Sequence, residues 1–144
     1  MNITPQMYSE MTKNASPKSD TKTNVAVAFL TGGSICTVGQ IILRVLSDFG
    51  LDKSTSSAWT SIILVVLSSM LTGMGLYQKL AKYAGAGTLV PITGFSNAVS
   101  SCAIEAKSEG YVLGVGTKIF TIAGPVILYG CTASVIYGLL YYFA

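Results

Sequence analysis

The stretch KSTSSAWTSIILVVLSSMLTGMGLYQK, residues 53–79, decides the fold class of this 144-residue chain. Between Lys53 and Lys79 lie 25 consecutive residues without a charge, and their centre is the unbroken apolar run at 62–67. An α-helix needs about 20 apolar residues to cross a bilayer core roughly 30 Å thick. The stretch is long enough for such a helix, which we expect at residues 58–77.

The same pattern recurs in three further places along the chain. Charge-free stretches of 21, 22 and 26 residues occupy positions 23–43, 83–104 and 119–144. Only 10% of the residues are charged and 51% are hydrophobic, with a mean hydropathy of +0.59. Soluble domains average about 25% charged residues. We therefore predict an all-α integral membrane protein with about four hydrophobic segments.

These segments divide the chain into two parts. Residues 1–24 are polar and cannot bury enough apolar surface to offset chain entropy, so we expect a mobile N-terminal tail. Residues 25–144 are the expected transmembrane domain, with spans at about 25–46, 58–77, 84–104 and 119–143. If all four cross, five Lys and Arg residues lie on the tail side and four on the other. The positive-inside rule then leaves the orientation open.

The third segment differs from the others because helix-breaking and polar residues interrupt it. They are Gly85, Gly87, Thr88, Pro91, Thr93, Gly94 and Asn97. Proline removes a backbone donor and obstructs the preceding turn, and glycine costs about 1 kcal/mol against alanine in a helix interior. Irregular backbone persists at membrane depth only where protein covers it or where it faces a water-filled cavity. We expect a broken or re-entrant helix at 84–104.

Residue types that carry catalysis or bind metals are scarce. The chain has no histidine, the commonest general base and metal ligand. Cys36, Cys102 and Cys131 lie in separate segments, so we interpret them as packing residues rather than a disulfide framework or zinc site. The net charge of +3 includes no basic run of the kind that binds nucleic acid. We expect no enzyme activity, no cofactor, no bound metal and no nucleic-acid partner.

The interrupted segment suggests a solute path. In transporters, broken helices direct half-helix N-termini toward anions and unwound carbonyls toward cations. We predict that the seven residues named in the third segment line or gate such a path together with Gln40, and that Glu105, Lys107, Glu109 and Lys118 lie at its mouth. Alternatives stay open: Gln40 could form a helix-to-helix hydrogen bond, and Glu105 and Glu109 could belong to a solvated loop. The same features also suit a scaffold helix inside a larger assembly.

Three blocks of sequence are long and unusual enough to be specific. They are GAGTLVPITGFSNA at 85–98, EAKSEGYVLGVG at 105–116 and KIFTIAGPV at 118–126. Together they resemble the stage V sporulation AC/AEb family of membrane proteins. The resemblance covers about residues 25–144, and the polar tail is similar to the AC branch of the family.

The resemblance implies a protein of the inner spore (forespore) membrane in an endospore-forming bacterium. Its relatives are associated with uptake of dipicolinic acid with calcium during sporulation and with its release on germination, and a mechanosensitive-channel role is attributed to the AC branch. The implied partners are a SpoVA-type membrane subunit (AEb-like) and a soluble, thiolase-like AD subunit. Because four spans do not easily enclose an aqueous path, we expect an oligomer. The alternative is a non-conducting membrane scaffold that docks the partner subunits.

Overall fold

The computed structural model describes residues 4–15 and 20–143. Its elements, in chain order, are α1 (Pro5–Ala15), α2 (Thr21–Asp48), α3 (Lys53–Gly73), α4 (Leu76–Ala84), the 3-10 helix η1 (Gly85–Thr88), α5 (Pro91–Glu105), the 3-10 helix η2 (Ala106–Glu109), the π-helix η3 (Tyr111–Gly116) and α6 (Thr117–Phe143). No strand occurs within these described ranges. The predicted all-α class is confirmed.

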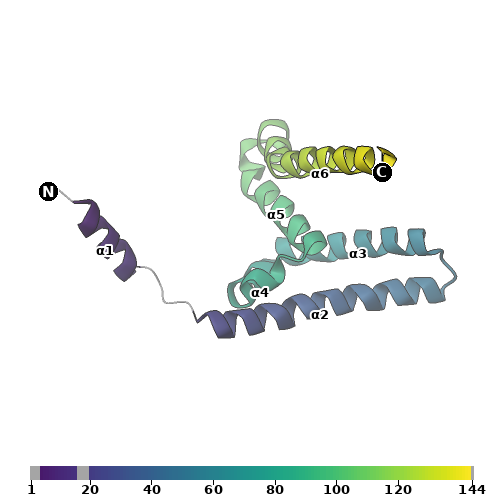
Figure 1. Cartoon of the computed structure of the whole chain (residues 1–144), viewed down its shortest axis with the longest axis horizontal. Helices are drawn as coiled ribbons and strands as arrows, with labels where there is room; N and C mark the ends of the chain where they lie inside the picture. The colour runs from purple at the N-terminus through teal and green to yellow at the C-terminus, as the bar shows by residue number, and fades with distance from the viewer. Residues whose placement is uncertain (1–3, 16–19, 144) are drawn as a thin grey trace.

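Helices α2 and α3 form an antiparallel hairpin (Figure 1). Asp52 caps α3, because its carboxylate accepts hydrogen bonds from the backbone N–H groups of Ser54 and Thr55 at 3.0 and 3.1 Å. Hydrogen bonding to the Thr55 hydroxyl and to these N–H groups holds the pKa of Asp52 below its usual value. The carboxylate thereby fixes the point at which the chain enters the second long helix.

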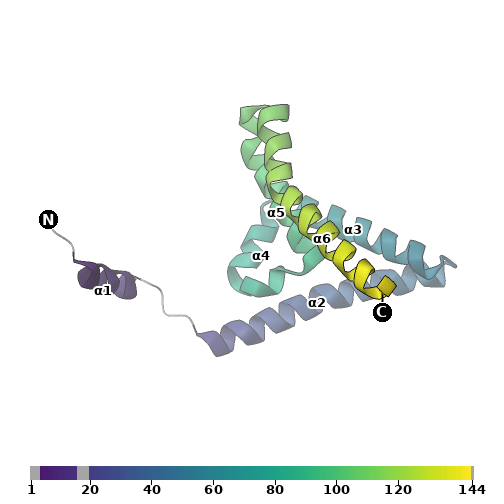
Figure 2. The ribbon, with the colours of Figure 1, turned by 45° about the horizontal axis from the view of Figure 1, so that its top comes forward.

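The chain reverses direction at the end of α3. Gly75 adopts a left-handed conformation with φ of +69°, which glycine tolerates because it has no Cβ. Helix α4 and η1 then pack on α2, while α5 runs back across α3 (Figure 2). Helix α3 ends at Gly73, whereas the sequence pattern predicted one uninterrupted span over 58–77. The glycine turn divides that apolar stretch in two.

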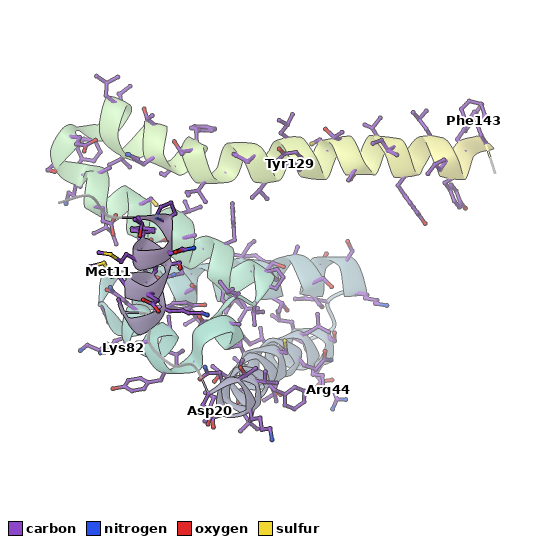
Figure 3. All side chains as sticks on the ribbon, turned by 60° about the vertical axis from the view of Figure 1, so that its left-hand side comes forward. Met11, Asp20, Arg44, Lys82, Tyr129 and Phe143 are labelled. Carbon is purple, nitrogen blue, oxygen red and sulfur yellow. The ribbon has the colours of Figure 1, made fainter. Side chains whose placement is uncertain are left out.

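Helix α6 forms an arm that leaves the rest of the molecule. It follows the π-helix, in which the Val115 N–H donates to the Gly110 carbonyl at 2.9 Å, and it continues through Pro125. Its contacts are with α5 and η3. Figure 3 shows side chains, including the labelled Tyr129 and Phe143, standing out around the arm. No residue of α6 is buried.

Three helices within the described ranges are long and apolar enough to cross a membrane. They are α2, α3 and the continuous helical stretch Tyr111–Phe143. The third predicted segment is not one helix, since η1 and the non-helical residues 89 and 90 separate α4 from α5. With 15 residues, α5 is about 22 Å long, shorter than a bilayer core of roughly 30 Å. Crossing or re-entry of this segment stays a prediction.

The N-terminal region also differs from the sequence-based picture. The tail contains α1, a helix that we did not expect, and every described side chain in it is exposed. Helix α2 begins at Thr21, four residues before the expected domain boundary at residue 25. The remaining residues of the tail lie outside the described ranges, so the mobility expected of them stays a prediction.

Candidate functional site

One face of α3 carries small polar side chains at a spacing of four residues. Its buried residues are Ser56, Thr60, Leu64 and Ser68, and half-buried Thr72 continues the series. Residues four apart lie on the same face of an α-helix. Small side chains on such a face let a second helix approach closely in a membrane. Helix α5 packs on the part of this face that carries Ser68 and Thr72, while Ser56 and Leu64 lie beside α2.

Hydrogen bonds between hydroxyl groups and carbonyls join α3 to α5. The Ser68 hydroxyl donates to the Thr93 carbonyl at 2.7 Å, and the Ser96 hydroxyl donates to the Val65 carbonyl at 2.9 Å. The hydroxyls of Ser69 and Ser96 lie 2.9 Å apart. We call this set the hydroxyl seam; its members are Ser68, Ser69, Thr72, Thr93, Ser96, Asn97 and Ser100.

The seam begins beside the break in the third apolar segment. Pro91 occupies the first turn of α5, where a missing backbone donor does no harm. The carbonyl of Thr88, at the end of η1, accepts a hydrogen bond of 2.8 Å from the hydroxyl of buried Tyr77. Protein groups therefore satisfy this part of the irregular backbone, as membrane depth requires.

Gly87 brings η1 directly against α2. A Cβ atom at position 87 would lie 2.6 Å from the carbonyl oxygen of Ala28 and 3.0 Å from the Cβ of Thr31. Only glycine fits at that separation from a backbone atom. The contact places the break between α4 and α5 on the inner surface of α2.

A cavity of about 390 Å³ adjoins the seam where α3, α4 and α5 meet. Its lining residues are Thr72, Gln78, Ala81, Asn97, Ser101, Ile104 and Glu105. The volume is within the range that small-molecule sites occupy in proteins, about 300–1,000 Å³. Five of these seven lining side chains carry an amide, a hydroxyl or a carboxylate, so the cavity suits a polar ligand.

Asn97 connects the seam to this cavity. The Thr72 hydroxyl donates to Asn97 Oδ1 at 2.8 Å. The amide N–H groups of Asn97 have no hydrogen-bond partner in the described part of the chain and remain available as donors. Glu105, the last residue of α5, supplies a carboxylate to the same lining. Together the two side chains offer donors to an anion and an acceptor to a cation.

The structure brings only two of the predicted path residues, Asn97 and Glu105, into this cavity. Gln40 lines a different cavity, of about 320 Å³, between α2 and α3. The others have separate positions: Gly85, Gly87 and Thr88 in η1, exposed Pro91 at the start of α5, buried Thr93 in the seam, Gly94 against Leu89, exposed Lys107 and Glu109 in η2, and exposed Lys118 in the first turn of α6.

Sequence reasoning missed the part of the site that α3 and α4 contribute. Thr72, Gln78 and Ser101 were not singled out, although each lines the cavity. For Thr72 the signal was its four-residue spacing from Ser68 on the buried face of α3, but hydropathy averages over such small polar residues. Among the described residues no group of three His, Cys, Asp or Glu side chains is placed to hold a metal ion.

Comparison with known proteins places the chain in a family. A family model described as "SpoVAC/SpoVAEB sporulation membrane protein" matches residues 24–140. Stage V sporulation protein AC of Bacillus subtilis (strain 168) is 41% identical over 134 residues, which cover 92% of this chain and 89% of that protein. No solved structure matches the chain. The resemblance seen in the sequence is thereby confirmed, and the chain belongs to the SpoVAC/SpoVAEB family of sporulation membrane proteins.

Proposed function

We propose that this chain is a membrane subunit of the channel that moves dipicolinic acid, with calcium, into the developing spore and out of it on germination. The observation that carries the proposal is the polar cavity between α3, α4 and α5, beside an interrupted helix. Its relatives are membrane proteins of sporulation. A cavity of this kind next to broken helices is where transporters hold charged solutes.

The lining of the cavity offers groups that suit both the dipicolinate anion and the calcium cation. Dipicolinate carries two carboxylates, which accept hydrogen bonds from amide N–H groups such as those of Asn97. Calcium prefers oxygen ligands, including carboxylates and amide carbonyls. Glu105 and Gln78 supply such oxygens in the same lining. Lys107 and Lys118, both exposed, would attract the anion toward this end of the molecule.

The remaining parts of the proposal concern the setting in which the subunit works. We place it in the inner spore membrane, as an oligomer, with an AEb-like membrane subunit and a soluble, thiolase-like AD subunit as partners. The channel would respond to membrane tension, and the chain would perform no covalent chemistry. Tension sensitivity is compatible with a fold whose long C-terminal helix buries no residue and is therefore in contact with lipid along its length.

A second candidate function is a non-conducting scaffold that docks the other subunits. It is favoured by the hydrogen bonding of the buried polar atoms: no buried side-chain nitrogen or oxygen in the described residues lacks a hydrogen-bond partner. Contacts whose buried polar atoms are all hydrogen-bonded can serve helix packing alone. Single-channel currents from the purified chain in liposomes would support the channel, and their absence in the presence of intact protein would support the scaffold.

The test in spores compares dipicolinate content with and without this chain, and with the variants Asn97→Leu and Pro91→Ala restored in its place. We expect content to fall without the chain, to recover with the intact copy and to stay low with either variant. Thr132→Leu, on the exposed face of α6, is the matched control and should restore content. Membrane levels of each protein are measured by immunoblot. Normal content with both variants would contradict the assigned path.

A further inference from the structure

Helix α1 carries its large apolar side chains on one face. Met7, Tyr8 and Met11 fall within an arc of about 100°, since each residue of an α-helix turns by about 100°. The opposite arc carries only polar side chains, which are those of Gln6, Ser9, Glu10 and Lys13. A narrow apolar face opposite a polar one is typical of a helix that lies on an apolar surface. We call Met7, Tyr8 and Met11 the α1 apolar face.

No other described part of the chain covers this face. Met7, Tyr8 and Met11 are 45%, 66% and 58% exposed. The helix begins with favourable signals, because the Thr4 hydroxyl accepts a hydrogen bond of 3.4 Å from the Met7 backbone N–H and Pro5 lies in the first turn. Isolated helices shorter than about 12 to 15 residues are nevertheless marginal in water, and α1 has 11 residues. A stable α1 therefore requires a partner other than the described residues.

A membrane surface lies within the covalent reach of α1. Residues 16–20 connect Ala15 at the end of α1 to Thr21 at the start of α2, and the Cα atoms at the two ends of such a connection are at most about 22 Å apart. Helix α2 is suited to crossing a membrane. Its first turn is polar and its apolar run begins at Val25, so that turn belongs at the lipid–water boundary. Helix α1 is therefore held near this boundary in every copy of the chain.

We propose that α1 lies along the lipid–water interface, with its apolar face toward the acyl chains and its polar face toward headgroups and water. Tyr8 suits this depth, because a tyrosine ring is apolar and its hydroxyl is polar. Lys13 on the polar face can pair with lipid phosphates. Three large apolar side chains are few for a protein partner, since a stable protein interface buries about 800 Å² on each side. Such an anchor fixes the depth at which α2 enters the membrane.

Fluorescence quenching tests the proposal on the full-length chain in liposomes of phosphatidylcholine and phosphatidylglycerol. The three native cysteines are replaced by alanine, and a fluorophore is attached to one introduced cysteine at a time: Met7→Cys or Met11→Cys on the apolar face, Ser9→Cys or Lys13→Cys on the polar face. We expect nitroxide-labelled lipids to quench positions 7 and 11 about threefold more strongly than positions 9 and 13, and iodide on both sides of the vesicle to show the opposite preference. Equal quenching at the four positions overturns the proposal. Protection of positions 7 and 11 from both quenchers also overturns it, because the face would then lie against protein.

A matched pair of substitutions then tests whether the apolar face holds α1 on the membrane. Methionine, lysine and glutamine have similar helix propensities, so Met11→Gln and Lys13→Gln change the surface of α1 with little effect on helix formation. With the fluorophore at position 7, Met11→Gln should lower the quenching by nitroxide-labelled lipids about twofold, whereas Lys13→Gln should lower it much less. Unchanged quenching in Met11→Gln, or an equal loss in both variants, rules out binding through this face. Because the measurement is the depth of α1, it is independent of whether the chain transports dipicolinate.

Discussion

The region from α2 to α5 and the arm α6 differ in which of their side chains are buried. The region from α2 to α5 buries small polar residues such as Ser56, Ser68 and Ser96, with large apolar side chains directed outward. The arm α6 has 27 residues, most of them apolar, and buries none of them. In water this distribution would be unfavourable, because exposed apolar surface raises the free energy. In a bilayer it is favourable, since lipid solvates large apolar side chains and small polar ones hold helices together.

The difference shows which region has a fixed geometry. Ser68, Ser96 and Tyr77 each donate a hydrogen bond to a backbone carbonyl of another element, at 2.7 to 2.9 Å. Such contacts define how α3, α4 and α5 sit against one another. Helix α6 is placed only at its base, by contacts with α5 and η3. The cavity is therefore found among the seam helices, while the arm buries none of its residues.

The largest effect that we predict is the loss of stability when a single methyl group is added at a glycine in the packed region. Gly87→Ala places a Cβ 2.6 Å from the Ala28 carbonyl oxygen, so η1 must move away from α2. We expect a loss of about 2 to 3 kcal/mol in the free energy of unfolding, the upper part of the range for overpacking. Equilibrium unfolding in mixed detergent micelles measures it.

Gly138→Ala on the arm is the matched control for this change. A Cβ at position 138 meets no atom within 4 Å, and alanine is the better helix former. The control should unfold no more easily than the unmodified protein. If both glycine variants lose the same amount of stability, the distinction between a packed region and an arm in contact with lipid is wrong.

A smaller loss of stability is predicted when a single hydrogen bond of the seam is removed. Ser68→Ala removes the hydroxyl that donates to the Thr93 carbonyl at 2.7 Å. Interhelical hydrogen bonds in membrane proteins contribute about 0.6 kcal/mol on average and up to about 1.7. We expect a loss in that range, measured by the same unfolding assay. Ser134→Ala, exposed on α6, should leave the stability unchanged; an equal loss there would show that the seam is not special.

The smallest effect concerns the cap of α3 and depends on pH. The pKa of Asp52 is lowered in the folded state by hydrogen bonds from the Thr55 hydroxyl and from backbone N–H groups. Its contribution to stability is therefore present above the unfolded pKa of about 3.9 and is lost as the pH falls through the lower folded value. Asp52→Asn keeps a good capping residue without a titrating group.

Thermal unfolding at pH 7 and pH 3 compares the two proteins. The unmodified chain should lose more stability on acidification than Asp52→Asn, because Asp52 takes up a proton at low pH and asparagine at the same position does not. An identical acid response in the two proteins would assign the loss to other carboxylates. The arm offers no equivalent, because α6 continues from the π-helix η3 without a capping side chain.

Hydropathy and charge spacing predicted much of the fold but little of the site. The all-α class followed from charge-free stretches of sufficient length, and three helices satisfy that criterion. The turn at Gly75, which follows the end of α3, was overlooked because a glycine within an apolar run does not lower hydropathy enough to mark a turn. Of the residues that line the cavity, Asn97 and Glu105 were among those predicted for a solute path, while Thr72 and Gln78 were not. The last two line a cavity only because α5 folds back across α3.

By itself, the sequence determined that this chain is helical, belongs in a membrane and comes from a family of sporulation proteins. These properties depend on local quantities: the length of each apolar stretch, the placement of charges and the identity of motif residues. Only the tertiary structure decided that Gly87 contacts α2, that Ser68 and Ser69 of α3 bond to α5, and that Gln40 lies apart from the cavity beside the seam. Each of these depends on which helix faces join, and in lipid that choice depends on close packing and hydrogen bonds between distant residues rather than on apolarity.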